Sequence, residues 1–288
     1  MPMSIAEIYT LFLKYPRICT DSRHIVPDSL FFALKGPNFN GNSYASEALD
    51  KGAAYAIVDE AEFAAPPRCL LVPDALKCLQ DLGTHHRRQS HATIIALTGS
   101  NGKTTTKELI TRVLNRKYNT LSTEGNLNNH IGVPLTLLKL VEDTEMAVIE
   151  MGANHQGEIG FLSGLAEPDY GYITNFGKAH LEGFGGVEGV IKGKSELYDY
   201  LLANGKQVFF NADDPIQREK LEAYDKKIGF STSDPAFYQI ENLGADPYVK
   251  LQVQDVTIQT QLSGAYNFSN CAIAVLIGKH FNIFLPDI

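Results

Sequence analysis

Apolar residues in the first ninety positions come in short runs of strand length, followed by one helical pattern. The runs are Leu30–Leu34, Ala54–Val58 and Cys69–Val72, and a helical period follows over Ala75–Arg88. Short apolar runs bounded by Gly- and Asn-rich turns such as Gly36–Asn42 are typical of buried strands. The first 88 residues are therefore predicted to form a small α/β unit that begins with an amphipathic helix.

A second series of strand-like runs begins at Thr93 and alternates with helical patterns. These runs are Ile94–Thr98, Ala147–Glu150, Tyr172–Asn175 and Val208–Asn211. Such alternation predicts a mostly parallel sheet flanked by helices. Val249–Leu262 alternates apolar and polar residues one by one, which predicts half-exposed strands, and Phe268–Phe281 resumes a helical period. We expect an α/β protein of two domains, residues 1–88 and residues 89–288.

Composition and charge narrow the class of protein. The chain has 44% hydrophobic and 20% charged residues, which excludes a disordered chain. Its formal charge of −8 argues against a nucleic-acid partner. It contains no run of 18 apolar residues, so we expect no membrane insertion. Its cysteines lack C-x-x-C spacing and indicate reduced thiols, which favours a cytoplasmic location.

The segment Thr98–Lys107, TGSNGKTTTK, stands between an apolar strand run and a helical pattern. Its glycines allow backbone amides to approach a phosphate closely. Lys103 supplies positive charge for the β- and γ-phosphates, and the Thr104 hydroxyl is suited to Mg²⁺. Leu97 occupies the position of the usual first glycine, so the loop is a contracted form. We predict a site for ATP and Mg²⁺ formed by Gly99, Ser100, Asn101, Gly102, Lys103, Thr104 and Thr105.

Two further polar residues lie beyond strand runs of the second series. Glu150 ends an apolar run, where a carboxylate is costly unless a cation pairs with it. Ligands bind at the carboxyl ends of strands in open parallel sheets, so Glu150 is expected to face the phosphate loop. His180 follows the run that ends at Asn175. Taken alone, a histidine at such a place is more often structural than a ligand.

Several motifs then occur in a fixed order. They are TDSR at 20–23, GNLNNHIGVPLTLL at 125–138, EMGANHQGEI at 150–159 and AHLE at 179–182. Together with the contracted loop they resemble the motifs of the Mur ligase family, over nearly all of the chain. The resemblance implies a small N-terminal α/β domain that binds a UDP-linked substrate, followed by a central P-loop domain. It also implies a role in peptidoglycan precursor synthesis.

The resemblance assigns metal-binding and catalytic roles. Glu150 and His180 would each bind Mg²⁺, and Lys194, in the segment VIKGKSELY, would become carbamylated and supply an anionic oxygen. Lys192 lies close enough to compete for this match, and a solvated helix lysine is the alternative. The implied catalytic residues are Lys103, His180 and Lys194, and the implied metal ligands are Thr104, Glu150, His180 and Lys194.

Other motif residues are implied to contact nucleotide or substrate. Asn211, in NADDP, resembles a nucleotide contact, although these residue types also favour a plain turn. GAYNFSN at 264–270 resembles a family motif in which Tyr266 replaces histidine, while Asn267 stays available for the nucleotide. For the UDP-linked substrate the resemblance implies Ser22, Arg23, Asn128 and the segment Phe39–Tyr44.

The implied activity is an ATP-dependent ligation. D-alanyl-D-alanine would be joined to UDP-N-acetylmuramoyl-tripeptide through an acyl phosphate. Two alternatives stay open: the family ligase that adds the third amino acid, and a P-loop switch protein that binds ATP without ligation. The family's third, C-terminal α/β domain has no counterpart before Ile288, so we expect a monomeric fragment that is nearly inactive alone.

Overall fold

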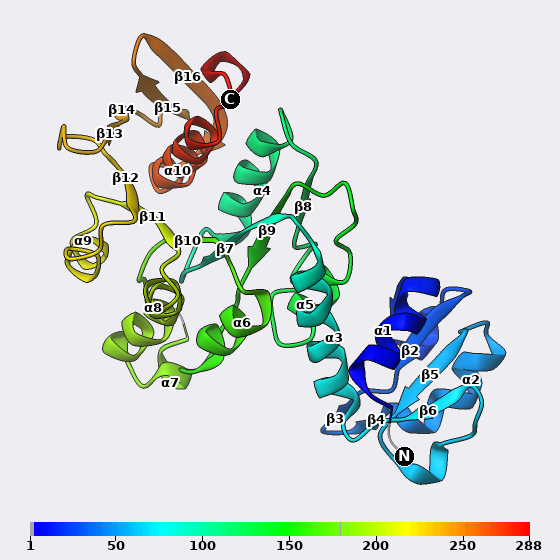
Figure 1. The fold of residues 1–288 in the computed structure, drawn as a ribbon. Coiled ribbons are helices and arrows are strands. Elements are labelled where there is room, and N and C mark those ends of the chain that lie inside the picture. Colours follow the sequence, from blue (N-terminus) through cyan, green and yellow to red (C-terminus); the bar gives the residue numbers. More distant parts are fainter. Residues whose placement is uncertain (1–2, 179) are drawn as a thin grey trace. The chain divides into compact units, whose positions relative to one another are not determined.

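The computed structural model describes residues 3–178 and 180–288, which form two compact units (Figure 1). One unit extends to Gln89 and includes residues 130–140; the other contains residues 90–129 and 141–288. Residues 130–140 were expected in the second domain. They belong to the first unit because helix α5 (Gly132–Leu137) packs on helix α3 (Ala75–Gln89) so closely that a Cβ at Gly83 would touch Pro134.

The first unit is a four-stranded parallel sheet with the strand order β1-β2-β5-β6. Its strands are β1 (Arg17–Cys19), β2 (Ser29–Phe32), β5 (Tyr55–Val58) and β6 (Cys69–Leu71). Leu30 and Phe32 share a core with α1 (Ile5–Lys14) and α3, whereas Phe31 packs with α2 (Ala45–Asp50). The predicted strands are confirmed. Strand β1 was not predicted, because three residues are too few to show a period.

A short hairpin and three single turns of helix complete the first unit. They are β3 (Lys35–Gly36) with β4 (Phe39–Asn40), and the 3₁₀ turns η1 (Ser22–His24), η2 (Gly41–Tyr44) and η3 (Ala61–Phe63).

The second unit contains a seven-stranded sheet in the order β13-β12-β11-β10-β7-β9-β8, with every neighbouring pair parallel. The strands are β7 (Thr93–Thr98), β8 (Thr120–Ser122), β9 (Met146–Glu150), β10 (Tyr170–Ile173), β11 (Gln207–Asn211), β12 (Lys227–Ser231) and β13 (Tyr238–Gln239). The predicted mostly parallel sheet is therefore confirmed.

Helices cover both faces of this sheet (Figure 1). They are α4 (Lys103–Leu114), α6 (Glu158–Ala166), α8 (Val187–Ala203), α9 (Pro215–Lys220) and α10 (Asn267–His280), while the short α7 (Leu181–Phe184) packs on α8. Ile95 and Leu97 of β7 point into the core shared with α4 and α10, while α6 and α8 pack on the opposite face. Alternate residues of a strand face opposite sides of the sheet, so both faces of β7 are apolar.

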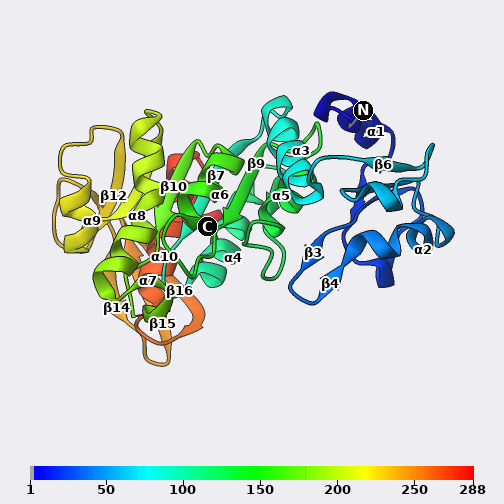
Figure 2. The ribbon, with the colours of Figure 1, turned by 90° about the horizontal axis from the view of Figure 1, so that it is seen from below.

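A small antiparallel sheet packs beside α10 in the second unit (Figure 2). It consists of β14 (Glu241–Gly244), β15 (Tyr248–Val253) and β16 (Val256–Ser263), and a 3₁₀ turn, η4 (Leu285–Asp287), follows α10. In β15, Val249, Leu251 and Val253 are buried and alternate with more exposed residues. The prediction of half-exposed strands over residues 249–262 is confirmed.

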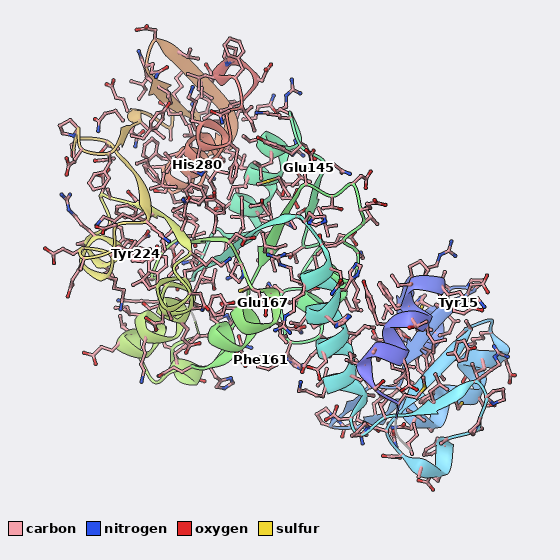
Figure 3. The ribbon with its side chains drawn as sticks, viewed as in Figure 1. Tyr15, Glu145, Phe161, Glu167, Tyr224 and His280 are labelled. Atoms are coloured by element: carbon pink, nitrogen blue, oxygen red, sulfur yellow. The ribbon has the colours of Figure 1, made fainter. Side chains whose placement is uncertain are left out.

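The two edges of the seven-stranded sheet carry different groups. Glu145 directly precedes β9 at the amino edge, and His280 ends α10 there, where its Nε2 lies 3.3 Å from Tyr170 Oη at the start of β10 (Figure 3). Helix α10 therefore runs antiparallel to the strands. Its first turn lies at the carboxyl edge, beside the glycine-rich loop.

Candidate nucleotide and metal site

The glycine-rich loop connects the end of β7 to the start of α4. Gly99 has φ +145° and Gly102 has φ +77°, conformations that other residues rarely adopt. A Cβ at Gly99 would overlap the Thr174 side chain, and one at Gly102 would press on Asn270. Glycine is needed at both positions because other segments of the chain close on the loop.

The chain that follows β10 holds this loop from one side. Ser100 N donates to Asn175 O (3.1 Å), and Asn101 N donates to Asn175 Oδ1 (3.1 Å). Thr174 Oγ1 donates to Asn101 O (2.6 Å). The amides of Ser100 and Asn101 are therefore occupied, and these residues fix the loop in the conformation described.

The first turn of α4 offers the amides that remain. No side chain caps this helix, and its first internal bond runs from Thr106 N to Gly102 O (2.8 Å). The N–H groups of Lys103, Thr104 and Thr105 precede that bond and have no partner within the helix. Three convergent N–H groups at a helix N-terminus favour an anion such as phosphate.

Lys103 lies folded over the loop. Its Nζ donates to Gly99 O (2.9 Å) and lies 3.4 Å from Ser100 O. Burial lowers the pKa of Lys103, and the nearby carboxylate of Glu150 opposes that shift. The ammonium is thus held at the cradle by weak carbonyl bonds that a phosphate oxygen can replace.

Glu150 is the residue that most strongly indicates a cation-binding site. The residue is 1% exposed, and its Oε1 accepts from Asn128 Nδ2 (2.8 Å) and lies 3.4 Å from Thr104 Oγ1. Its Oε2 is buried without a hydrogen-bond partner among the described residues. A buried carboxylate with one orphaned oxygen and a threonine hydroxyl near the other fits Mg²⁺, which prefers oxygen ligands. From the sequence, Asn128 was expected to contact the substrate. In the structure its side-chain amide donates a hydrogen bond to Glu150.

Lys194, one of the residues expected to bind a second Mg²⁺, does not offer an anionic oxygen as Glu150 does. Lys194 on α8 is 1% exposed, donates from Nζ to Ala153 O (3.2 Å) and lies 5.0 Å from the Phe184 ring centroid. Burial, together with the charge of Lys103, lowers the pKa of Lys194 to about 8. As an ammonium it repels a cation, so the unmodified set does not fit a second Mg²⁺.

His180 precedes α7 with φ +53° and is exposed. Among the residues that the structure describes, no three His, Cys, Asp or Glu side chains are grouped to hold a metal ion. Ala179 of the AHLE motif lies outside the described residues.

The first turn of α10 approaches the loop through two asparagines. Asn267 Nδ2 donates to Ser263 O (2.8 Å), and Asn267 Oδ1 accepts from Asn270 Nδ2 (2.8 Å). Asn270 Oδ1 in turn accepts from Thr106 Oγ1 of α4 (3.0 Å). Sequence reasoning named Asn267 and missed Asn270 and Thr106. The three-residue spacing of the asparagines was the available signal, because it places both on one face of a helix.

Asn211 ends β11 at the same edge of the sheet, where it forms a turn. Its Oδ1 accepts from Asp213 N (3.0 Å), and Asp214 Oδ1 accepts from Ile216 N (2.9 Å) to cap α9. The Asn211 carboxamide oxygen is thus used locally, as in an ordinary Asx turn.

The expected substrate residues of the first unit lie at the carboxyl end of β1. Ser22 is buried and its carbonyl accepts from Lys51 Nζ (2.9 Å). The Arg23 side chain is 80% exposed and donates hydrogen bonds to Asp21 from Nε (2.9 Å) and Nη2 (2.7 Å). These bonds hold the pKa of Asp21 well below its usual range. Further along the chain, in the expected substrate segment 39–44, the exposed rings of Phe39 and Tyr44 stack with centroids 5.3 Å apart. These groups suit a base and a phosphate.

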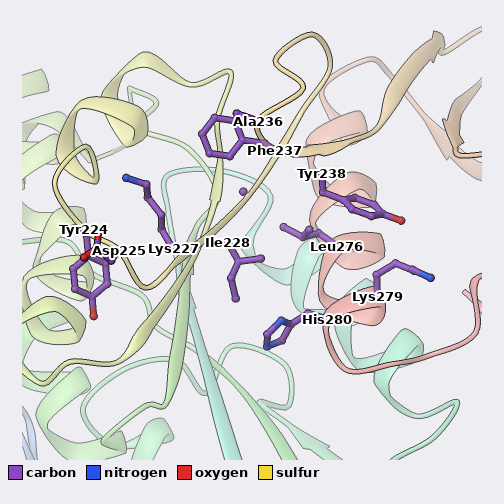
Figure 4. A pocket seen from close by; sticks show the side chains of 11 residues that line it. Tyr224, Asp225, Lys227, Ile228, Ala236, Phe237, Tyr238, Leu276, Lys279 and His280 are labelled. Carbon is purple, nitrogen blue, oxygen red and sulfur yellow. The ribbon is translucent and has the colours of Figure 1, made fainter.

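A cavity of about 570 Å³ lies elsewhere in the second unit (Figure 4). Its walls include Ile228, Phe237, Leu276 and His280, from β12, the chain before β13, and α10. None of the predicted site residues lines it, so this cavity does not coincide with the predicted nucleotide site.

These features define a P-loop nucleotide-binding protein with a parallel sheet, a contracted loop and a buried carboxylate opposite that loop. The profile of the Mur ligase middle domain matches residues 97–278, and that of the Mur ligase family catalytic domain matches residues 14–80. The chain belongs to the Mur ligase family.

Two curated relatives are named UDP-N-acetylmuramoyl-tripeptide–D-alanyl-D-alanine ligase. The chain is 35% identical to that of Bacillus subtilis in an alignment of 276 residues that covers 94% of the chain and 60% of the relative. It is 35% identical to that of Escherichia coli in an alignment of 279 residues that covers 94% of the chain and 61% of the relative. The chain thus spans about three fifths of the length of these relatives.

Solved structures resemble the whole chain. A crystal structure of MurF from Acinetobacter baumannii matches with a TM-score of 0.84 and 31% identity, covering 100% of this chain and 67% of that one. MurF from Thermotoga maritima in complex with ADP matches with a TM-score of 0.81 and 27% identity, covering 96% and 66%. In the described part of the chain, no helix is both long and apolar enough to cross a membrane.

Proposed function

We propose that this chain is the UDP-substrate- and ATP-binding part of a ligase that joins D-alanyl-D-alanine to UDP-N-acetylmuramoyl-tripeptide. The observation that carries the proposal is the orphaned Oε2 of Glu150, a carboxylate whose other oxygen, Oε1, lies 3.4 Å from Thr104 Oγ1 at the first turn of α4. A switch protein would share the loop. The named relatives that match 94% of the chain favour the ligase.

ATP binding is proposed at the loop and at α4. The free amides of Lys103, Thr104 and Thr105 would receive the β-phosphate, and Lys103 Nζ would exchange its loop carbonyls for phosphate oxygens. The solved relative from Thermotoga maritima that holds ADP supports this assignment. Asn267 and Asn270 would support the nucleotide from α10 through their link to Thr106.

Charge neutralisation and alignment are the proposed catalytic contributions of the chain. The tripeptide carboxylate attacks the γ-phosphorus of ATP. The bond from that phosphorus to the β–γ bridging oxygen breaks, ADP departs, and an acyl phosphate is formed. The amine of D-alanyl-D-alanine then displaces phosphate. Lys103 would neutralise charge on the transferred group, and Thr104 and Glu150 would hold Mg²⁺. Bound there, Mg²⁺ would screen the charge between the phosphates and orient them.

Lys194 and His180 are proposed to act near the transferred group as well. The buried amine of Lys194, with its lowered pKa, is suited to capture carbon dioxide as a carbamate. In that anionic form it would become an oxygen ligand in place of a repelling ammonium.

Calorimetric titration with three ligands tests this function. We expect the chain to bind ADP with Mg²⁺, and to bind UDP-N-acetylmuramoyl-tripeptide more tightly than the corresponding UDP-linked dipeptide. Preference for the dipeptide would indicate the ligase that adds the third amino acid. Binding of ADP without binding of either UDP-linked peptide would contradict the ligase and favour the switch protein.

A further inference from the structure

Lys107 is a buried cation that the proposed mechanism does not use. It lies one helical turn after Lys103 on α4 and is 1% exposed. Its Nζ donates to Thr123 O (2.6 Å) and pairs with Glu108 Oε1 (2.8 Å). Lysine is almost never fully buried without such partners, because desolvating the ammonium is costly.

Thr123 connects this lysine to strand β9. It directly follows β8, is fully buried, and continues the ladder by donating from its amide to Val148 O (3.0 Å). Its Oγ1 accepts from the backbone amide of Glu150 (3.0 Å). Its carbonyl is bonded by Lys107 Nζ. A buried carbonyl left without a partner is unfavourable, so the bond from Lys107 stabilises Thr123 in this position.

Glu150 is consequently fixed at both ends. Its backbone amide is bonded to Thr123 and its Oε1 to Asn128, which leaves Oε2 as the carboxylate oxygen of Glu150 that has no partner among the described residues. Groups that orient a metal ligand from behind commonly change metal affinity by about 10–100-fold when they are removed.

We propose that Lys107 is a positioning residue that acts through Thr123 to fix Glu150 and aim its Oε2 at the divalent cation. The inference rests on the proposed function, because it requires the cation at Glu150.

The test compares ADP binding with and without Mg²⁺ by calorimetry. Lys107→Met keeps the length of the side chain but removes the ammonium. We expect its ADP affinity in EDTA to stay within about twofold of that of the unsubstituted chain. The Mg²⁺ concentration that gives half of the maximal increase in ADP affinity should rise about tenfold or more. Lys250→Met, at an exposed position of β15, is the matched control and should change neither quantity.

A second pair of variants separates positioning from folding. Thr123→Val removes the hydroxyl that receives the Glu150 amide and should also raise the Mg²⁺ requirement, whereas Thr123→Ser keeps the hydroxyl and should not. An unchanged Mg²⁺ requirement in folded Lys107→Met overturns the proposal. If Lys107→Met does not fold, an unchanged requirement in Thr123→Val overturns it instead. If Mg²⁺ does not strengthen ADP binding in the unsubstituted chain, the proposed metal site itself fails.

Discussion

Two loops of this molecule follow strands of parallel sheets and are both expected to meet phosphate groups, yet they are built differently. The loop after β7 is held by residues distant in sequence, namely Thr174, Asn175 and Asn270. The turn after β1 is held mainly by a neighbour, since Arg23 pairs with Asp21 two positions earlier. The Arg23 side chain stays 80% exposed.

This difference predicts how much conformational entropy each loop loses when it binds a phosphate. The loop after β7 is fixed by bonds to distant segments, so a phosphate that binds at the first turn of α4 has little of this loop left to order. The Nε and Nη2 groups that Arg23 uses to bond Asp21 must exchange partners before they can bond a phosphate, and the exposed side chain loses conformational freedom when it binds. We therefore expect larger effects from changes at the first loop than at the second.

The largest effect is expected from Lys103→Met. It removes the ammonium that would bond the β- and γ-phosphates. Hydrogen bonds to charged groups contribute about 1.5–3 kcal/mol, so ADP affinity should fall about 10–100-fold or more while the fold persists. Calorimetry with ADP measures this. Lys192→Met, at an exposed position of α8, should leave affinity unchanged. Equal affinity in both variants would remove Lys103 from the phosphate site.

Gly99→Ala tests whether the first loop is prearranged by its neighbours. The added Cβ would overlap the Thr174 side chain and would need a backbone conformation with φ +145°. We expect unfolding free energy to fall by about 1–3 kcal/mol, measured by chemical denaturation. Thr174→Ala in the same chain should recover part of that loss by relieving the overlap. Additive losses would show that the two residues are not coupled.

The chemistry of Lys194 should depend on pH. Its pKa of about 8 lies below that of an ordinary lysine, so above pH 8 the amine is mostly neutral and able to capture carbon dioxide. At pH 6 only about 1% of it is neutral. Carbon-13 NMR with labelled bicarbonate should show a carbamate signal at pH 8.5 that weakens at pH 6. A signal that persists in Lys194→Ala would assign the carbamate to another amine.

The smallest effect is expected from Arg23→Ala in the first unit. The exposed pair with Asp21 contributes little to folding, so unfolding free energy should change by less than about 0.5 kcal/mol. Affinity for UDP-N-acetylmuramoyl-tripeptide should fall about tenfold at low salt. Asp21→Asn should act in the opposite direction, because it releases Arg23. If both variants bind the substrate as the unsubstituted chain does, the turn after β1 does not contact its phosphates.

Local patterns in the sequence were sufficient for the loop and for most strands. Thr98–Lys107 combines a strand end, two glycines and Lys103 within ten positions, so neighbouring residues were enough to predict where the turn lies and what it would bind. The apolar runs predicted β7, β9 and β11 because burial imposes a pattern on every strand of a covered sheet.

Only the tertiary structure decided which side chains meet at the site. Asn128 reaches Glu150 across 22 positions, Thr104 reaches it across 46, and Thr106 reaches Asn270 across 164. It also decided that residues 130–140 pack with the first unit. Hydrophobic periodicity reports which face of an element is buried, but it does not report the element on the other side of the contact. Those partners are selected by packing of the whole chain, which left one oxygen of Glu150 unpartnered beside the phosphate loop.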